Sequence, residues 1–244
     1  MDKPNPFAGI KTCGSLAELG VFIAVIFAAQ VAVLLLASLA ADRFGFRPDT
    51  YEVMIPAFLL SAWLSWRALS GLGVSFRAAW ADWQANAVPD LFKALKYLAG
   101  YAAVLLAIGA ALFAFYALMG EGFLGAMDKV SATSAAQTAS AKALSVSAFR
   151  FGLLLLSACV VAPVAEELFF RRIVFASLRG RYGFWPSAFW SGLLFAVFHG
   201  WGAPVTLPVG VYLAWVYERE RRLPVNIMLH GLVNFLMTSY KVFS

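Results

Sequence analysis

Apolar residues run along this chain in long stretches that polar segments separate. Residues 19–41 contain no charge, and Gln30 and Ser38 are their only polar side chains. As a helix rising about 1.5 Å per residue, such a stretch crosses the hydrocarbon core of a bilayer, which is ~30 Å thick. The stretches expected to lie in the membrane are 19–41, 52–69, 97–119, 148–178, 185–199, 205–217 and 225–241. This pattern predicts an all-α polytopic membrane protein of about seven to eight transmembrane helices.

The segments between the apolar stretches differ in character. Residues 73–96 mix charged and aromatic side chains, which predicts an amphipathic helix on the membrane surface, broken near Pro89. Residues 120–146 are rich in alanine, serine and threonine and are expected to form a non-cytoplasmic loop. The stretch 148–178 is too long for one straight crossing, and Pro163 within it predicts a kink or a break.

Composition and charge favour a membrane protein and argue against nucleic-acid binding. Hydrophobic residues make up 62% of the chain and charged residues 13%, against about 45–50% and about 25% in soluble domains. The net charge of +6 comes from scattered lysines and arginines, most of which lie inside if the N-terminus is cytoplasmic. No dense basic run is present, and the polar residues 1–18 predict no cleavable signal peptide. We therefore expect a multi-pass protein of a bacterial plasma (inner) membrane, with the lipid bilayer as a partner and no nucleic acid.

Three polar clusters interrupt the apolar second half of the chain. An ionisable group within hydrocarbon is costly, so each is by default a candidate for function. Both histidines of the chain belong to these clusters. The clusters are Glu166 and Glu167 with Arg171, Phe195 with His199, and His230 with Asn234.

Helix lengths predict that these clusters lie at compatible depths. Glu166 precedes an expected helical hairpin by ~20 Å, and His199 follows the same hairpin by ~20 Å. Asn234 lies ~15 Å and His230 ~9 Å beyond the next turn on that side. A carboxylate, two imidazoles and an amide are therefore expected to share one cavity.

Spacing along each helix predicts different roles for these side chains. Glu167 and Arg171 are four residues apart, which favours a structural ion pair. Glu166 points about 100° away from Glu167 and has no local partner. A carboxylate in apolar surroundings suits a general base. His230 and Asn234 are also four residues apart, so both could donate to one oxyanion.

Each cluster also has a purely structural interpretation. Histidine and asparagine in membrane helices often join neighbouring helices by hydrogen bonds. Phe195 shares a helix face with His199 and is expected to form a wall of the cavity. Three costly clusters at compatible depth nevertheless favour a functional site.

The three clusters together resemble the motifs of a known family. Glu166-Glu167-Leu-Phe-Phe-Arg171 resembles the EExxxR motif of the CAAX-protease and bacteriocin-processing (CPBP, also called Abi) family. Phe195-Ala-Val-Phe-His199 resembles its FxxxH motif, and His230-Gly-Leu-Val-Asn234 its HxxxN motif. Order and spacing both fit, and the resemblance covers roughly residues 150–240.

The resemblance implies an all-helical intramembrane glutamic endopeptidase related to the type II CAAX prenyl endopeptidase. Glu166 and His199 would activate a water, while His230 and Asn234 would stabilise the oxyanion. Glu167 and Arg171 would orient the site. The family implies no cofactor, and its partner would be a protein or peptide substrate at the membrane. The motifs carry over neither the prenylated substrate of the eukaryotic relatives nor an oligomeric state.

The resemblance also suggests a division of the chain. Residues 1–150 would supply N-terminal transmembrane helices and the interfacial segment, and residues 151–244 the catalytic core, within one integrated membrane domain.

Two alternatives stay open at this point. Glu166, His199 and His230 could supply three ligands of a metal-dependent hydrolase, although no HExxH pair is present. The chain could also be a non-catalytic immunity or scaffold protein that keeps a polar core for folding.

Overall fold

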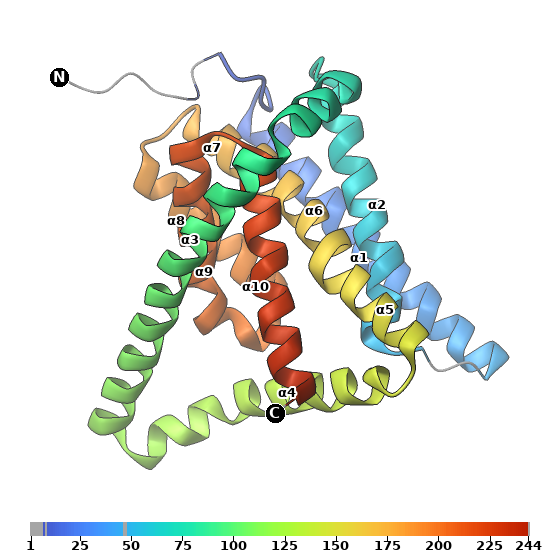
Figure 1. The fold of residues 1–244 in the computed structure, drawn as a ribbon, viewed down its shortest axis with the longest axis vertical. Helices are drawn as coiled ribbons and strands as arrows, with labels where there is room; N and C mark the ends of the chain where they lie inside the picture. The colour runs from blue at the N-terminus through green and yellow to red at the C-terminus, as the bar shows by residue number, and fades with distance from the viewer. Residues whose placement is uncertain (1–6, 8, 46–47, 244) are drawn as a thin grey trace.

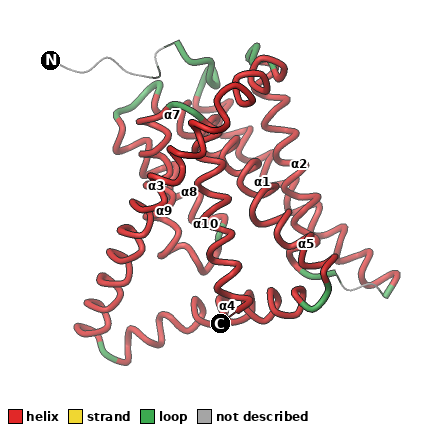
Figure 2. Tube along the Cα trace, viewed as in Figure 1, coloured by secondary structure: helices red, strands yellow, loops and turns green. Residues whose placement is uncertain are grey.

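The described part of the chain is almost entirely helical (Figures 1 and 2). The computed structural model describes residues 7, 9–45 and 48–243, and no strand occurs among them. The predicted all-α fold is therefore confirmed.

The helices follow one another with short turns between them. In chain order they are α1 (Leu16–Phe44), α2 (Thr50–Gly71), α3 (Phe76–Met119), α4 (Glu121–Ser145), α5 (Ala148–Leu156), η1 (Ser157–Val161), α6 (Ala162–Glu166), η2 (Glu167–Phe175), α7 (Ala176–Arg179), α8 (Phe184–Phe198), η3 (Gly200–Gly202), α9 (Ala203–Glu220) and α10 (Leu223–Phe243).

The structure has the helices of a multi-pass membrane protein. Within the described residues, four helices are long and apolar enough to cross a membrane: α1, α2, α3 and the run Ala148–Arg179. Helix α8 is apolar but shorter. Large apolar side chains cover the outside of α1, Leu36 and Leu39 each being 65% exposed, as expected for a surface that faces lipid.

Helix α4 corrects the prediction of a loop over residues 120–146. Residues Glu121–Ser145 form one helix, which crosses the molecule near the C-terminal end of α10 (Figure 1). Alanine has the highest helix propensity of all residues, and this alanine-rich segment is helical although its apolar pattern is weak. The weak apolar pattern predicted a loop, but the helix propensity of the alanines prevails.

Helix α3 corrects a second prediction, the break near Pro89. The expected interfacial helix and the expected span 97–119 are one helix of 44 residues with Pro89 inside it. Proline removes one hydrogen bond, but the next residue, Asp90, is buried and accepts from Arg222 Nε at 2.6 Å. Hydrogen bonds from Asp90, and then Asp82, hold the pKa of the Arg222 guanidinium above its usual range, so this anchor stays charged.

Pro163 was predicted to cause a kink or a break, and no break occurs, because the run Ala148–Arg179 stays helical through it. The helix instead widens on both sides of Pro163, into the π-helical segments η1 and η2. Such π segments accommodate local irregularities and are frequent at functional sites. Glu166 ends α6 and Glu167 begins η2, so the two carboxylates lie where the helical geometry changes.

Two apolar cores flank the central helices. One joins α1 and α2 to η2 and α8, with Phe169 and Phe170 at its centre. The other joins α3, α9 and α10 around Tyr97 and Leu229. The run Ala148–Arg179 contributes to the first core and α10 to the second, and these two segments carry two of the three motifs.

Candidate active site

Glu167 and Arg171 form the predicted ion pair. Arg171 Nε lies 3.0 Å from Glu167 Oε2, and both side chains are 0% exposed. The guanidinium also lies over the ring of Phe195, 5.1 Å from its centroid. A pair this deeply buried is held by its mutual attraction, because neither charge has access to water.

Glu167 has two further partners, both on α10. His230 Nδ1 donates to Glu167 Oε1 at 3.0 Å, and Asn226 Nδ2 donates to Glu167 Oε2 at 3.3 Å. Asn226 was not predicted from the sequence. The signal was available, because Asn226, His230 and Asn234 recur every four residues and so share one face of the helix.

Glu166 differs sharply from its neighbour. Its Oε2 atom is buried without a hydrogen-bond partner among the described residues, and its side chain lines a cavity. Nε2 of His230, which is charged only when the ring is protonated, lies 3.7 Å from this atom. The two adjacent glutamates thus differ: Glu167 is hydrogen-bonded by three side chains, whereas Glu166 can accept a hydrogen bond from a ligand or a water in the cavity.

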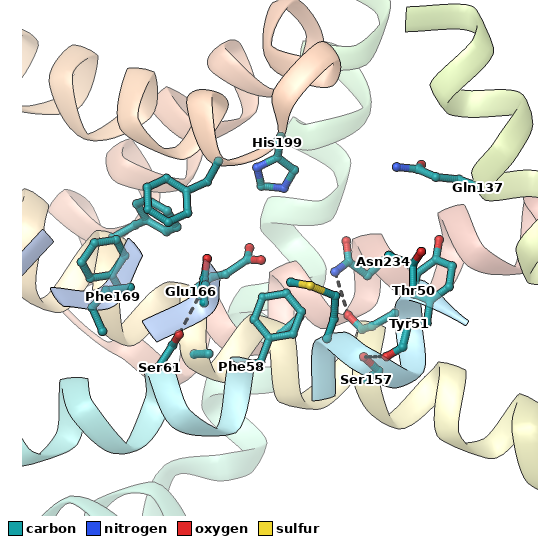
Figure 3. A pocket seen from close by; sticks show the side chains of 18 of the residues that line it. Thr50, Tyr51, Phe58, Ser61, Gln137, Ser157, Glu166, Phe169, His199 and Asn234 are labelled. Carbon is teal, nitrogen blue, oxygen red and sulfur yellow. Dashed lines mark hydrogen bonds between the residues drawn. The ribbon is translucent and has the colours of Figure 1, made fainter. Parts of the chain in front are cut away.

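His199 lies at the C-terminal end of α8 and lines the same cavity. Its Nδ1 atom lies 2.7 Å from the carbonyl oxygen of Phe195. A carbonyl can only accept, so Nδ1 carries the hydrogen and Nε2 of the neutral ring keeps its lone pair. In Figure 3 the His199 ring points into the cavity from the side opposite Phe58.

Phe195 supports the two histidines from behind. Its ring centroid lies 4.3 Å from that of His199 and 6.0 Å from that of His230. Phe195 is 2% exposed and is not among the residues that line the cavity. It therefore backs the imidazoles, whereas the sequence predicted a wall of the cavity itself.

His230 and Asn234 do not occupy equivalent positions. Asn234 lines the cavity, and its Nδ2 donates to the carbonyl oxygen of Ala158 at 2.7 Å. His230 is 6% exposed and lies behind Glu166, bonded to Glu167. Asn234 keeps its second amide hydrogen for a ligand, while the free nitrogen of His230 faces Glu166.

A glycine makes this arrangement possible. Gly231 packs against the π segment η1 so closely that a Cβ atom there would lie 2.5 Å from the carbonyl oxygen of Cys159. The missing side chain lets α10 approach η1, and Asn234 reaches Ala158 O as a result.

The cavity has a volume of about 520 Å³, within the range of small-molecule and peptide-sized sites. Glu166, His199 and Asn234 lie along it, between two ends of different polarity (Figure 3). The mainly apolar end is lined by Ile26, Phe169, Phe170 and Phe198, with Gln30 and Ser61 beside them; the polar end is lined by Thr50, Tyr51, Gln137, Ser140 and Ser157. Helices of the first 150 residues therefore supply much of the wall.

The three-ligand metal alternative finds no support in the side-chain geometry. Across the described residues, no group of three histidine, cysteine, aspartate or glutamate side chains lies close enough to hold a metal ion. Both cysteines, Cys13 and Cys159, are unpaired.

Comparison with known proteins points to the same part of the chain. A family model described as "Type II CAAX prenyl endopeptidase Rce1-like" matches residues 147–236, a range that holds all three motifs. The chain is also 25% identical over 122 residues to the "Putative membrane peptidase YdiL" of Bacillus subtilis (strain 168), which covers 49% of this chain and 50% of that relative. The chain thus matches about half the length of that protein. No solved structure matches significantly.

These matches confirm the resemblance to the CPBP family that the motifs predicted. Residues 147–236 are thus similar to a family described as type II CAAX prenyl endopeptidases. The catalytic roles of the individual residues stay predictions.

Proposed function

We propose that this protein is an intramembrane endopeptidase in which Glu166 and His199 activate a water for peptide hydrolysis. One observation carries the proposal: of two adjacent carboxylates, Glu167 is bound by three side chains, while Glu166 lines a cavity and its Oε2 atom has no hydrogen-bond partner among the described residues. Environments that separate two neighbouring carboxylates in this way assign one to structure and the other to proton transfer.

The proposed reaction uses three groups that line the cavity, Glu166, His199 and Asn234, and His230 directly behind Glu166. A water donates one hydrogen to Glu166 and the other to the lone pair of His199 Nε2, which aims its oxygen at the scissile carbonyl carbon. As the new C–O bond forms, Glu166 takes the proton. The second amide hydrogen of Asn234 and the Nε2–H of a charged His230 stabilise the oxyanion. The C–N bond then breaks, and Glu166 passes its proton to the leaving amine.

The cavity also favours a kind of substrate. The apolar end would hold a large hydrophobic side chain on one side of the cleaved bond, and the polar end suits small or polar residues on the other. We propose a membrane-associated protein or peptide as substrate. The host membrane would be a bacterial plasma membrane, with the N-terminus of this protein in the cytoplasm.

The test compares the termini of membrane proteins in cells that carry wild-type protein or Glu166→Ala. Termini present only with wild-type protein should share an apolar residue on one side of the cut. Loss of a general base removes about 10²–10⁴-fold of the rate, so Glu166→Ala should abolish these termini. Glu121→Ala, an exposed residue at the start of α4, is the matched control and should preserve them.

The same experiment separates the alternatives. Identical termini in wild-type and Glu166→Ala cells would overturn the glutamate mechanism. Full complementation of a deletion strain by Glu166→Ala would support a scaffold or immunity role. Activity of the purified protein that disappears with a chelator and returns with zinc would support a metal hydrolase.

A further inference from the structure

Asn226 is a buried polar residue that lies outside the three motifs. It is 0% exposed in the first turns of α10, four residues before His230. Its Nδ2 atom donates both hydrogens, one to Glu167 Oε2 at 3.3 Å and one to the carbonyl oxygen of Leu213 on α9 at 2.8 Å. A fully buried polar side chain with two polar partners on two other helices calls for an explanation.

The orientation of the Asn226 amide is fixed by its partners. A carboxylate and a carbonyl can only accept, so the NH₂ group must face both of them. The carbonyl Oδ1 of Asn226 is then left buried without a partner. Leaving a buried acceptor unsatisfied is costly, so an apolar side chain of similar size would suit packing alone better.

Arg171 binds Glu167 through a single hydrogen bond. Arginine commonly binds a carboxylate through two parallel N–H···O bonds. Here only Nε bonds to Glu167, and both Nη atoms of Arg171 are buried without hydrogen-bond partners. Asn226 on Oε2 and His230 on Oε1 together keep the carboxylate out of this two-bond geometry.

We propose that Asn226 is a positioning residue for His230. By fixing one oxygen of Glu167, Asn226 presents the other oxygen to His230 Nδ1 and so directs His230 Nε2 towards Glu166. That this orientation of His230 serves catalysis rests on the proposed peptidase function. That Asn226 sets the orientation rests only on the contacts of Asn226, Glu167 and His230.

Asn226→Leu tests the proposal, because leucine has similar size and no donor. Without Asn226, Glu167 should turn into a two-bond pair with Arg171 and release His230. Asn226→Asp is the second variant, since it places a second carboxylate against Glu167. Asn86→Leu and Asn86→Asp are matched controls, because Asn86 donates to Asp82 in the same manner on an exposed helix face.

The first readout is nitrogen NMR of protein labelled with ¹⁵N-histidine in lipid nanodiscs. The two histidines give two sets of ring signals, assigned with His199→Gln. In wild-type protein the Nδ1 proton of His230 should exchange slowly with water. In Asn226→Leu it should exchange at least about tenfold faster, and its resonance should move, while the His199 signals and both Asn86 variants stay unchanged.

The second readout is turnover of a peptide that spans a cleavage site found in the comparison of termini. Misplacing a catalytic group by about 1 Å can cost about 10²-fold in rate. The Asn226 variants should therefore lower kcat by at least about tenfold with KM unchanged.

Unchanged His230 signals in folded Asn226→Leu and Asn226→Asp would overturn the proposal. Failure of both variants to fold would also overturn it, by making Asn226 a structural residue. If wild-type protein cleaves nothing, the peptidase proposal fails, while the NMR result still decides the role of Asn226.

Discussion

At the residue scale, the site depends on how a buried charge is neutralised. Glu167 is fully buried and has three partners, of which Arg171 is the only permanent cation. Its other partners, Asn226 and His230, donate hydrogen bonds but cannot by themselves hold a full negative charge in the membrane interior. We therefore expect Arg171 to contribute more to the free energy of unfolding than the arginines of the exposed ion pairs do.

Arg171→Ala should lower the free energy of unfolding by about 3–5 kcal/mol, because it removes the one permanent cation that compensates the buried charge of Glu167. Unfolding in mixed detergent micelles with increasing dodecyl sulfate, followed by circular dichroism, measures the change. The control is Arg150→Ala, since Arg150 pairs with Glu52 at a more exposed site and should contribute little. Equal effects of the two substitutions would show that the buried pair contributes no more to stability than the exposed one.

The residue scale also shows what spacing can and cannot predict. The pair Glu167–Arg171 lies within one helical run, so its i,i+4 spacing was sufficient to predict the ion pair. Asn226 and the position of His230 behind Glu166 depend on how α10 packs against η2. Spacing places Asn226 on the helix face of His230 and Asn234, but it carries no information on the rotation of one helix against another, so the contacts of that face with Glu167 could not be predicted.

At the element scale, irregular helices bring the motifs together. The π segments η1 and η2 surround Glu166, and Gly231 lets α10 lie directly against η1. The sequence indicated an irregularity through Pro163, but a π-helical widening satisfies the backbone without the break that the proline predicted. Similarly, the alanine content of α4 favoured a helix where polarity alone suggested a loop.

Gly231→Ala should disturb the site from outside the motif residues. The new Cβ atom would meet the backbone of Cys159, so α10 must move away from η1 and Asn234 should lose its bond to Ala158. We expect a loss of about 1–3 kcal/mol in stability, as for overpacked cores, together with a fall in peptide turnover. Both are measured on purified protein, by unfolding and by initial rates.

Gly109→Ala provides the control for that substitution. Gly109 lies within α3, and a Cβ atom there would have nothing within 4 Å. Replacing a glycine in an open helical position should raise stability by about 0.5–1 kcal/mol. If Gly231→Ala behaves like Gly109→Ala, the close approach of α10 to η1 is not required.

At the scale of the whole molecule, the cavity and the charge distribution define a direction across the membrane. The cavity takes its wall from both the first 150 residues and the remainder, so the predicted division at residue 150 does not separate a site from a scaffold. Arg172 and Arg181 donate to the backbone carbonyls of Lys11 and Cys13. The N-terminal segment therefore lies at the same end as the arginine-rich turns, and α4 lies at the opposite end (Figure 1).

The positive-inside rule assigns the arginine-rich end to the cytoplasm, which makes the orientation testable by labelling. Cysteines are introduced singly, as Tyr182→Cys in the turn before α8 or Gly122→Cys at the start of α4, into protein with Cys13 and Cys159 replaced by serine. Tyr182 is 45% exposed and Gly122 is exposed, so both thiols should react. A membrane-impermeant maleimide should label Gly122→Cys in intact cells and Tyr182→Cys only after permeabilisation, with the cysteine-free protein as the blank. The opposite pattern would place α4 and the polar end of the cavity on the cytoplasmic side, and substrates would then have to reach Glu166 from the cytoplasm.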